Sequence, residues 1–132
     1  MTITPDTNLL VRVVVLDDPT QTERARMELA QAAQVFVTLP ALCEFCWVLK
    51  SRYRFSDADI AEAVLSISEA ENVVVDADAV DAGVRLLRTG GDFADAVIAE
   101  LGRRQGGQIF ISFDRTAVRL LAATGFAARE PT

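Results

Sequence analysis

Short apolar runs alternate along the chain with longer segments in which apolar residues recur every three or four positions. The recurrence predicts helices, and the short runs predict strands; Val35–Thr38 is apolar enough for a strand buried on both faces of a parallel sheet. Strands are expected at 2–5, 35–38, 72–75 and 109–112, with a last short one at 125–127. Helices are expected at 7–16, 20–33, 40–52, 57–70, 77–89, 93–105 and 115–123.

This alternation predicts an α/β fold with a central parallel sheet of four to five strands and helices on both faces. At 132 residues, the chain is expected to form one domain over 1–132. Start and stop signals fix several boundaries. Asp6 is a good N-cap, Pro19 suits the first turn of a helix, and Gly90-Gly91 should end one.

Composition limits the chemistry that the chain can perform. The net charge is −6, so a broad cationic surface for polyanions is not expected. A nucleic acid would have to be met by local arginines, a metal ion or another subunit. No apolar run approaches the ~20 residues of a membrane span, and the N-terminus lacks the pattern of a signal peptide, so a cytoplasmic location without a membrane partner is expected.

The chain contains no histidine, which excludes Ser-His-Asp and Cys-His catalysis and every zinc site with histidine ligands. Cys43 and Cys46 have the spacing of a redox pair. Their neighbours are largely apolar, which favours small core residues instead. Acid–base work would therefore fall to carboxylates, Lys, Tyr or metal-bound water.

Five carboxylates from four segments are expected at one edge of the sheet, where ligands of open parallel sheets bind. Asp6 follows the first predicted strand, and Asp114 follows the fourth. Glu44 lies in the first turns of the helix after the second strand. Asp92 and Asp95 open the helix that precedes the fourth strand, one turn apart on the same face.

Each carboxylate also has a simpler explanation. Asp6, Asp92 and Asp114 could be N-caps or turn residues, and Asp95 would favour its helix dipole. Glu44 is harder to explain, because the residues three and four positions away from it are all apolar. A carboxylate there would be costly to bury unless it were partly solvated, paired with an arginine or bound to a cation.

Taken together, these residues predict a site made only of oxygen ligands. Such a site suits a hard cation such as Mg²⁺ or Mn²⁺, and converging negative charges repel unless a cation neutralises them. The chemistry that fits is metal-assisted displacement at phosphorus, in which metal-bound hydroxide removes the need for a histidine base.

Four segments of the chain resemble a PIN domain, and more narrowly the VapC toxins of bacterial type II toxin–antitoxin pairs. The resemblance covers essentially the whole chain and implies a three-layer α/β/α domain. The segments are Pro5-Asp6-Thr7-Asn8, the helix carrying Glu44, Gly91-Asp92-Phe93-Ala94-Asp95-Ala96, and Ser112-Phe113-Asp114-Arg115.

The resemblance implies an endoribonuclease dependent on Mg²⁺ or Mn²⁺. Asp92 would then be an auxiliary ligand or a cap. The catalytic and metal-binding quartet would be Asp6, Glu44, Asp95 and Asp114, supported by hydrogen bonds from Thr7, Asn8 and Ser112.

The resemblance also implies partners. The substrate would be tRNA, rRNA or mRNA, whose cleavage arrests translation and growth. Family members commonly form homodimers, and a cognate antitoxin protein blocks them, often by placing an arginine in the acidic pocket. Arg12 and Arg115 lie close in sequence to the proposed ligands and are candidate RNA contacts.

Two other readings remain open. The chain could be a non-catalytic PIN-like module that acts through protein contacts. It could also be a receiver-type signalling domain, which would want an Asp after its third strand and a Lys late in the chain. Asp76 could serve as the first, but the only lysine is Lys50.

Overall fold

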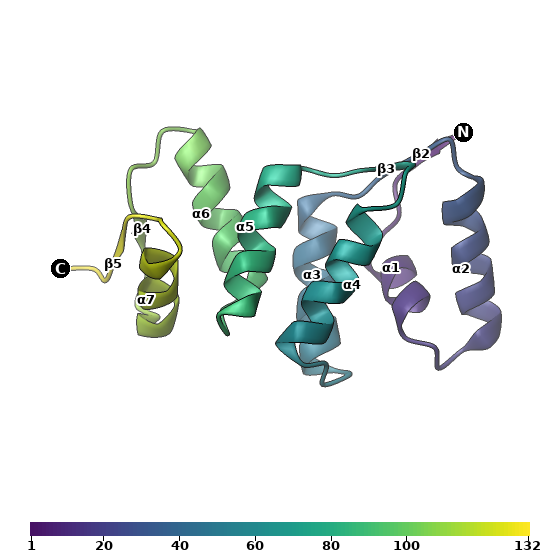
Figure 1. Cartoon of the computed structure of the whole chain (residues 1–132), viewed down its shortest axis with the longest axis horizontal. Helices are drawn as coiled ribbons and strands as arrows, with labels where there is room; N and C mark the ends of the chain where they lie inside the picture. Colours follow the sequence, from purple (N-terminus) through teal and green to yellow (C-terminus); the bar gives the residue numbers. More distant parts are fainter. The chain divides into compact units, whose positions relative to one another are not determined.

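The computed structural model describes every residue from 1 to 132. Contacts within the chain divide it into an N-terminal unit, Met1–Asp76, and a C-terminal unit, Ala77–Thr132. Each unit contains its own parallel sheet (Figure 1). No helix in either unit is both long enough and apolar enough to span a lipid bilayer.

The N-terminal unit is built on a three-stranded sheet in the order β1-β2-β3, with every pairing parallel. Val35 at the centre of β2 is paired with Ile3 and Val73 and is fully buried. The strands are β1 (Thr2–Ile3), β2 (Gln34–Phe36) and β3 (Val73–Val74), and the helices are α1 (Thr7–Val14), α2 (Pro19–Gln31), α3 (Leu39–Ser51) and α4 (Asp57–Ser68).

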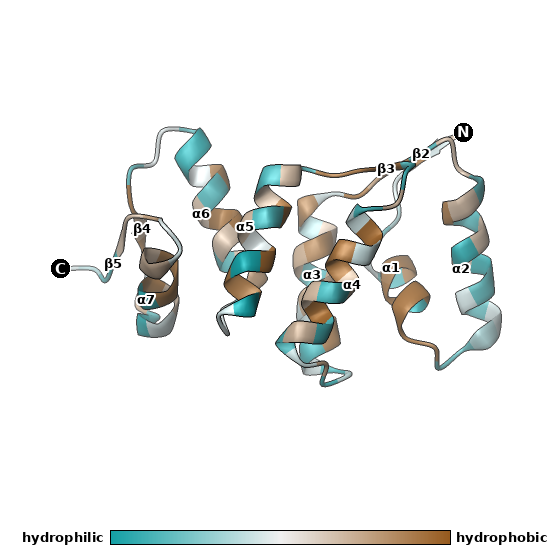
Figure 2. Ribbon diagram, in the orientation of Figure 1, coloured by the Kyte–Doolittle hydropathy of each residue, from teal (hydrophilic) through white to brown (hydrophobic).

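The core of this unit comes mainly from α1, α3 and α4. Leu10, Leu42, Phe45, Ile60 and Val64 are all fully buried. Figure 2 shows that α2, in contrast, is largely hydrophilic, and it buries only Thr22 and Ala25. The helix starts follow their sequence signals, because Asp6, Asp18, Thr38 and Ser56 each accept a capping hydrogen bond from the first turn.

The C-terminal unit contains α5 (Ala77–Arg88), α6 (Phe93–Arg104), β4 (Phe110–Ile111), α7 (Arg115–Ala123) and β5 (Ala128–Arg129). Strands β4 and β5 form a parallel pair. Helices α5 and α6 lie side by side and make the most extensive helix–helix packing in the chain (Figure 1).

A glycine permits the close approach of α5 to the start of α6. Gly83 faces the ring of Phe93, and a Cβ atom at Gly83 would lie 2.4 Å from two of its ring carbons. Phe93 is fully buried. The ring therefore occupies the space that any other residue at position 83 would fill, and this fixes where α6 begins.

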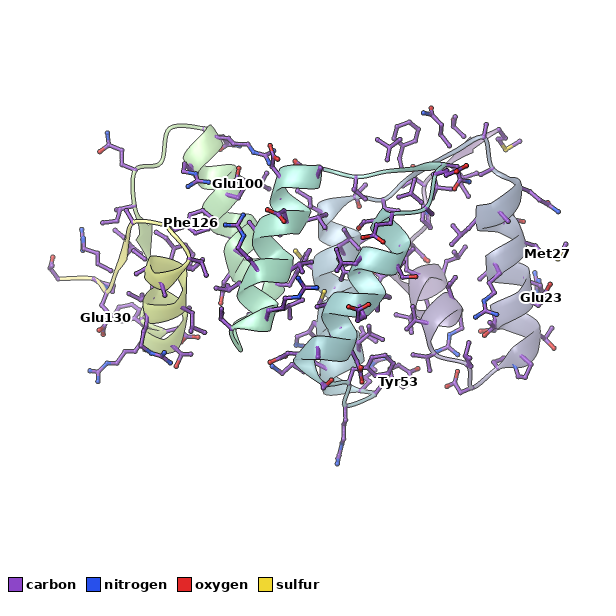
Figure 3. The ribbon with its side chains drawn as sticks, in the orientation of Figure 1. Glu23, Met27, Tyr53, Glu100, Phe126 and Glu130 are labelled. Carbon is purple, nitrogen blue, oxygen red and sulfur yellow. The ribbon has the colours of Figure 1, made fainter.

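A buried ion pair holds the other end of α6. Glu100 is only 8% exposed, and Arg103 and Arg104 both donate to its carboxylate. These hydrogen bonds lower the pKa of Glu100. Arg103 also lies over the ring of Phe126, 4.5 Å from its centroid, and this links α6 to the segment before β5 (Figure 3).

The predicted helices and the parallel α/β class are confirmed, but three details differ. The five strands form two sheets, of three and two strands, instead of one. Phe36 is 40% exposed, so the expectation that β2 is buried on both faces was wrong. The last strand begins at Ala128, because Gly125, with φ of 102°, and Phe126 complete the C-terminal turn of α7.

Replacing Gly83 with alanine is expected to lower the free energy of unfolding by about 1–2 kcal/mol. The overlap with Phe93 should cost more than the roughly 1 kcal/mol that alanine adds in helix propensity. Urea denaturation followed by circular dichroism measures the difference.

The matched control is Gly102→Ala in α6, where the added Cβ has no neighbour within 4 Å. This variant is expected to gain up to about 1 kcal/mol. Equal stability of the two variants would show that the contact between Gly83 and Phe93 does not constrain the fold.

Candidate functional site

In the N-terminal unit, Asp6 and Glu44 lie on neighbouring helices. Asp6 is the N-cap of α1, and its Oδ1 accepts a hydrogen bond from the N–H of Leu9 at 2.9 Å. The hydroxyl of Thr7 donates to the carbonyl of Ala41 at 3.4 Å. This bond ties the start of α1 to the start of α3, the helix that carries Glu44.

Glu44 lies at a solvated edge of α3, which is one of the explanations that the sequence left open. Glu44 is exposed, and so are two of its apolar neighbours on α3, Pro40 and Trp47. The buried face of α3 is formed by Leu42, Phe45 and other residues on the opposite side. Because the side chain of Glu44 is exposed to water, its charge carries little desolvation cost. Burial of Glu44 is therefore no argument for a bound cation.

In the C-terminal unit, the three acidic candidates interact electrostatically. Burial raises the pKa of Asp95, and the negative charges of Asp92 and Asp114 raise it further. Asp92 and Asp95 belong to the start of α6, and Asp114 is the N-cap of α7. Asp92 and Asp114 therefore lie close enough to Asp95 for their charges to oppose its own, and a bound cation would relieve this repulsion.

Asp92 occupies the N-cap position of α6 without making a capping bond through its side chain. The N–H of Asp95 bonds instead to the backbone carbonyl of Asp92, at 3.1 Å. The position predicted for Asp92 is confirmed, but the interaction expected of a cap is absent. The carboxylate of Asp92 is exposed and remains available to a ligand.

Capping and metal binding are compatible for Asp6 and Asp114. The Oδ1 of Asp114 accepts from the N–H of Ala117 at 3.0 Å, just as the Oδ1 of Asp6 accepts from Leu9. Each carboxylate keeps a second oxygen with its own lone pairs. The capping bond orients the carboxylate, as hydrogen bonds to metal ligands commonly do.

The three residues expected to support the ligands differ in what they do. Ser112 accepts a hydrogen bond from the N–H of Asp114 at 2.9 Å and so holds the turn that carries this carboxylate. Thr7 acts on Ala41 of α3, as described above. Asn8 is exposed and lines a shallow depression of about 320 Å³ beside Asp6.

The two arginines proposed to contact RNA have different surroundings. Arg12 donates to the hydroxyl of Tyr53 at 2.7 Å and pairs with Asp17, and its side chain is only 16% exposed. Tyr53 lies in the connection between α3 and α4 (Figure 3). Arg12 therefore links parts of the N-terminal unit. The side chain of Arg115, in contrast, is 86% exposed and forms an ion pair with Glu130 at 3.3 Å.

The carboxylates do not form a complete metal site within either unit. No three His, Cys, Asp or Glu side chains are grouped closely enough to hold a metal ion. The ligand quartet stays a prediction, in which Asp6 and Glu44 come from one unit and Asp95 and Asp114 from the other. The chemistry of the donor set, all carboxylate oxygens, fits Mg²⁺ or Mn²⁺.

Cys43 and Cys46 have different environments on α3. Cys46 is 4% exposed and belongs to the core of the N-terminal unit, as predicted, whereas Cys43 is half-buried. Both cysteines lie on the helix that carries Glu44.

Trp47 lies one turn beyond Glu44 on the same helix and is exposed to solvent. Its residue type alone did not reveal this exposure.

Comparison with protein families places the chain in a known class. The model of the PIN domain matches residues 3–121, which includes all five acidic candidates. The chain belongs to the PIN domain family, and the predicted fold class is confirmed. A search of curated proteins found no match.

One solved structure is similar over nearly the full length of both chains. It is VapC20 of Mycobacterium tuberculosis, described as a toxin that cleaves the sarcin-ricin loop. The two sequences are 19% identical, and the alignment covers 96% of this chain and 97% of VapC20 with a TM-score of 0.44. Values this low carry no argument about the activity of this chain.

Replacing Asp95 with asparagine is expected to stabilise the metal-free protein at neutral pH. Because the pKa of Asp95 is raised above its ordinary value of 3.8, the folded state binds this proton more tightly than the unfolded state. The wild type should therefore lose stability as pH rises from about 4 through the raised pKa, and the variant should not.

Thermal unfolding between pH 3 and pH 8 in EDTA measures this effect. At pH 7 the variant should melt about 2 °C higher, and the difference should vanish below pH 4. A wild type that equals or exceeds the variant at every pH would show that Asp95 is not under electrostatic strain.

Replacing Asp92 with alanine is expected to leave stability nearly unchanged or to raise it slightly, since no capping bond is lost and repulsion on Asp95 falls. The matched control is Asp18→Ala, which removes a capping bond of 3.1 Å to the N–H of Gln21 and should cost about 1 kcal/mol. Chemical denaturation compares the two. An equal loss of unfolding free energy in both variants would show that Asp92 does act as a cap.

Proposed function

We propose that this chain is an endoribonuclease dependent on Mg²⁺ or Mn²⁺ and the toxin of a type II toxin–antitoxin pair. PIN domains are generally nucleases, and this chain belongs to that family. The observation that carries the proposal is the position of Asp95, which is half-buried in the first turn of α6 with its charge opposed by Asp92 and Asp114. A carboxyl group whose pKa is raised by burial and by neighbouring negative charges is typical of functional sites.

Asp6, Glu44, Asp95 and Asp114 would hold the metal, with Asp92 as a further carboxylate near Asp95. The bound cation supplies an activated water and screens the charge that develops on the phosphate. No histidine is then required, in agreement with the composition.

The chain's own residues would orient the reacting groups. Capping bonds fix one oxygen of Asp6 and one of Asp114, so that the remaining oxygens need little reorganisation on binding. Ser112 steadies the turn that carries Asp114. The exposed guanidinium of Arg115, adjacent to Asp114, is the better placed of the two arginines to contact an RNA phosphate.

The proposed partners follow from the same site. The substrate would be tRNA, rRNA or mRNA, and its cleavage would inhibit translation and growth. An antitoxin would block the enzyme by placing a cationic side chain among the carboxylates, which attract a guanidinium as they attract a metal. A homodimer is proposed as the active assembly.

Purified protein is expected to cleave RNA with Mg²⁺ or Mn²⁺ and to lose this activity in EDTA. Asp6→Asn and Asp95→Asn should each reduce the rate by at least about 100-fold, because a ligand is lost while the shape of the side chain is kept. The control is Asp81→Asn, which removes an exposed carboxylate paired with Arg85 and should leave the rate unchanged.

Cleavage of a labelled RNA on a denaturing gel measures these rates. Unchanged metal-dependent cleavage in both Asp6→Asn and Asp95→Asn would overturn the assignment. Calorimetric titration with Mn²⁺ separates the enzyme from a non-catalytic PIN-like module, because a degenerate site should show no binding.

A further inference from the structure

Four of the exposed residues of α3 form one narrow stripe along the helix. Pro40, Glu44, Trp47 and Ser51 are all exposed and follow one another at intervals of three or four residues, so they share a face. Leu42, Phe45 and Leu49 on the other side are fully buried. Trp47 therefore contributes little to the core, although tryptophan is highly buried on average in folded proteins.

Trp47 is 61% exposed and lies one turn beyond Glu44. The rise of an α-helix places the two residues about 4.5 Å apart along the axis. Side chains on a helix generally lean towards its N-terminus, which is the direction in which Glu44 lies. A large aromatic surface thus stands in solvent next to a proposed metal ligand.

Cationic residues follow Trp47 on its other side. Lys50 is in the last turn of α3, and Arg52 and Arg54 lie in the segment after it. Lys50 is 3.2 Å from Asp57 but keeps 60% of its side chain exposed, and both arginines are exposed. Along α3 a carboxylate thus comes first, then the aromatic ring, and then positive charge that would attract a phosphate backbone.

We propose that Trp47 stacks against an unpaired base of the RNA substrate and thereby positions the strand for cleavage near Glu44. This inference rests on the proposed nuclease function. Proteins that recognise RNA specifically mostly do so at unpaired bases stacked on aromatic side chains, and stacking tolerates any base. A chain with a net charge of −6 also needs affinity for RNA that does not come from charge alone.

The surroundings of Trp47 fit RNA better than a second copy of the chain. The cores of protein–protein interfaces are depleted of charged residues. Here a single large apolar side chain has charged residues three positions away in both directions, Glu44 before it and Lys50 after it. A dimer contact is therefore an alternative outcome of the test.

The chain contains one tryptophan, so its intrinsic fluorescence reports on Trp47 alone. The full chain would be titrated in EDTA, which prevents cleavage, with a single-stranded RNA oligonucleotide and with an abasic oligonucleotide of the same length. The RNA is expected to quench the emission to saturation. The abasic strand keeps the phosphates but has no base to stack, so it should quench far less.

Affinity measurements on variants test the stacking directly. Trp47→Leu should weaken binding about tenfold, and Trp47→Phe should retain most of the affinity. The dependence of log Kd on log salt should keep its slope in both variants, because no charge is lost. The matched control is Leu16→Ala, which alters a side chain of nearly the same exposure, 62%, and should bind as the wild type does.

The outcomes separate this inference from the proposed function. Cleavage with Mg²⁺ alongside wild-type affinity in Trp47→Leu, or no saturable quenching by RNA, would overturn the stacking role and leave the nuclease intact. Quenching and the loss of affinity without any cleavage would overturn the nuclease alone. Emission that shifts with protein concentration in the absence of RNA, with dissociation of Trp47→Leu in sedimentation, would assign this face to a dimer contact instead.

Discussion

The C-terminal unit depends on the packing of one aromatic ring against one glycine. Phe93 is fully buried because Gly83 leaves room for its ring on α5. Phe93 lies between Asp92 and Asp95 in the sequence. The contact that buries its ring therefore also fixes the positions of these two residues at the start of α6. Gly91 acts in the same way, since a Cβ there would lie 2.6 Å from the side chain of Leu86. The acidic start of α6 is therefore positioned by core packing and needs no capping bond from Asp92.

This arrangement has an electrostatic cost that the packing must offset. Asp95 is held near two other carboxylates and partly removed from water, and both effects oppose its charged form. Burial of Phe93, Ala96 and Leu121 supplies favourable energy in the same unit. Glu100 shows the contrasting case on the same helix, where two arginines satisfy the carboxylate. Carboxylates without such partners can stay close together only where the packing of the surrounding residues holds them in place.

The sequence predicted the helices well because their boundaries are set locally. Asp6 and Pro19 act within one turn of their own positions, and the structure has each where the pattern placed it. The grouping of strands into sheets was less predictable, because strands of two or three residues contain little periodicity and their partners are distant in sequence. Pairing depends on long-range packing that no local window contains.

The same distinction explains the candidate site. Spacing correctly indicated which residues share a face of α3, but it could not indicate which face packs against the core. The apolar residues around Glu44 left its burial open, and in the structure Pro40 and Trp47 are exposed to solvent together with Glu44. The types and order of the acidic residues were readable because they match a family pattern. Their electrostatic coupling in the C-terminal unit required the folded chain.

Helix starts explain how so many acidic residues can be tolerated. Asp6, Asp92 and Asp114 each stand at the N-terminus of a helix, and Asp95 lies in a first turn. The positive end of a helix dipole favours a carboxylate there, and free N–H groups orient it. For Asp6 and Asp114, the observed role as caps is therefore compatible with the proposed role as ligands. A carboxylate already anchored by one oxygen presents the other with little loss of entropy, which is what binding a cation requires.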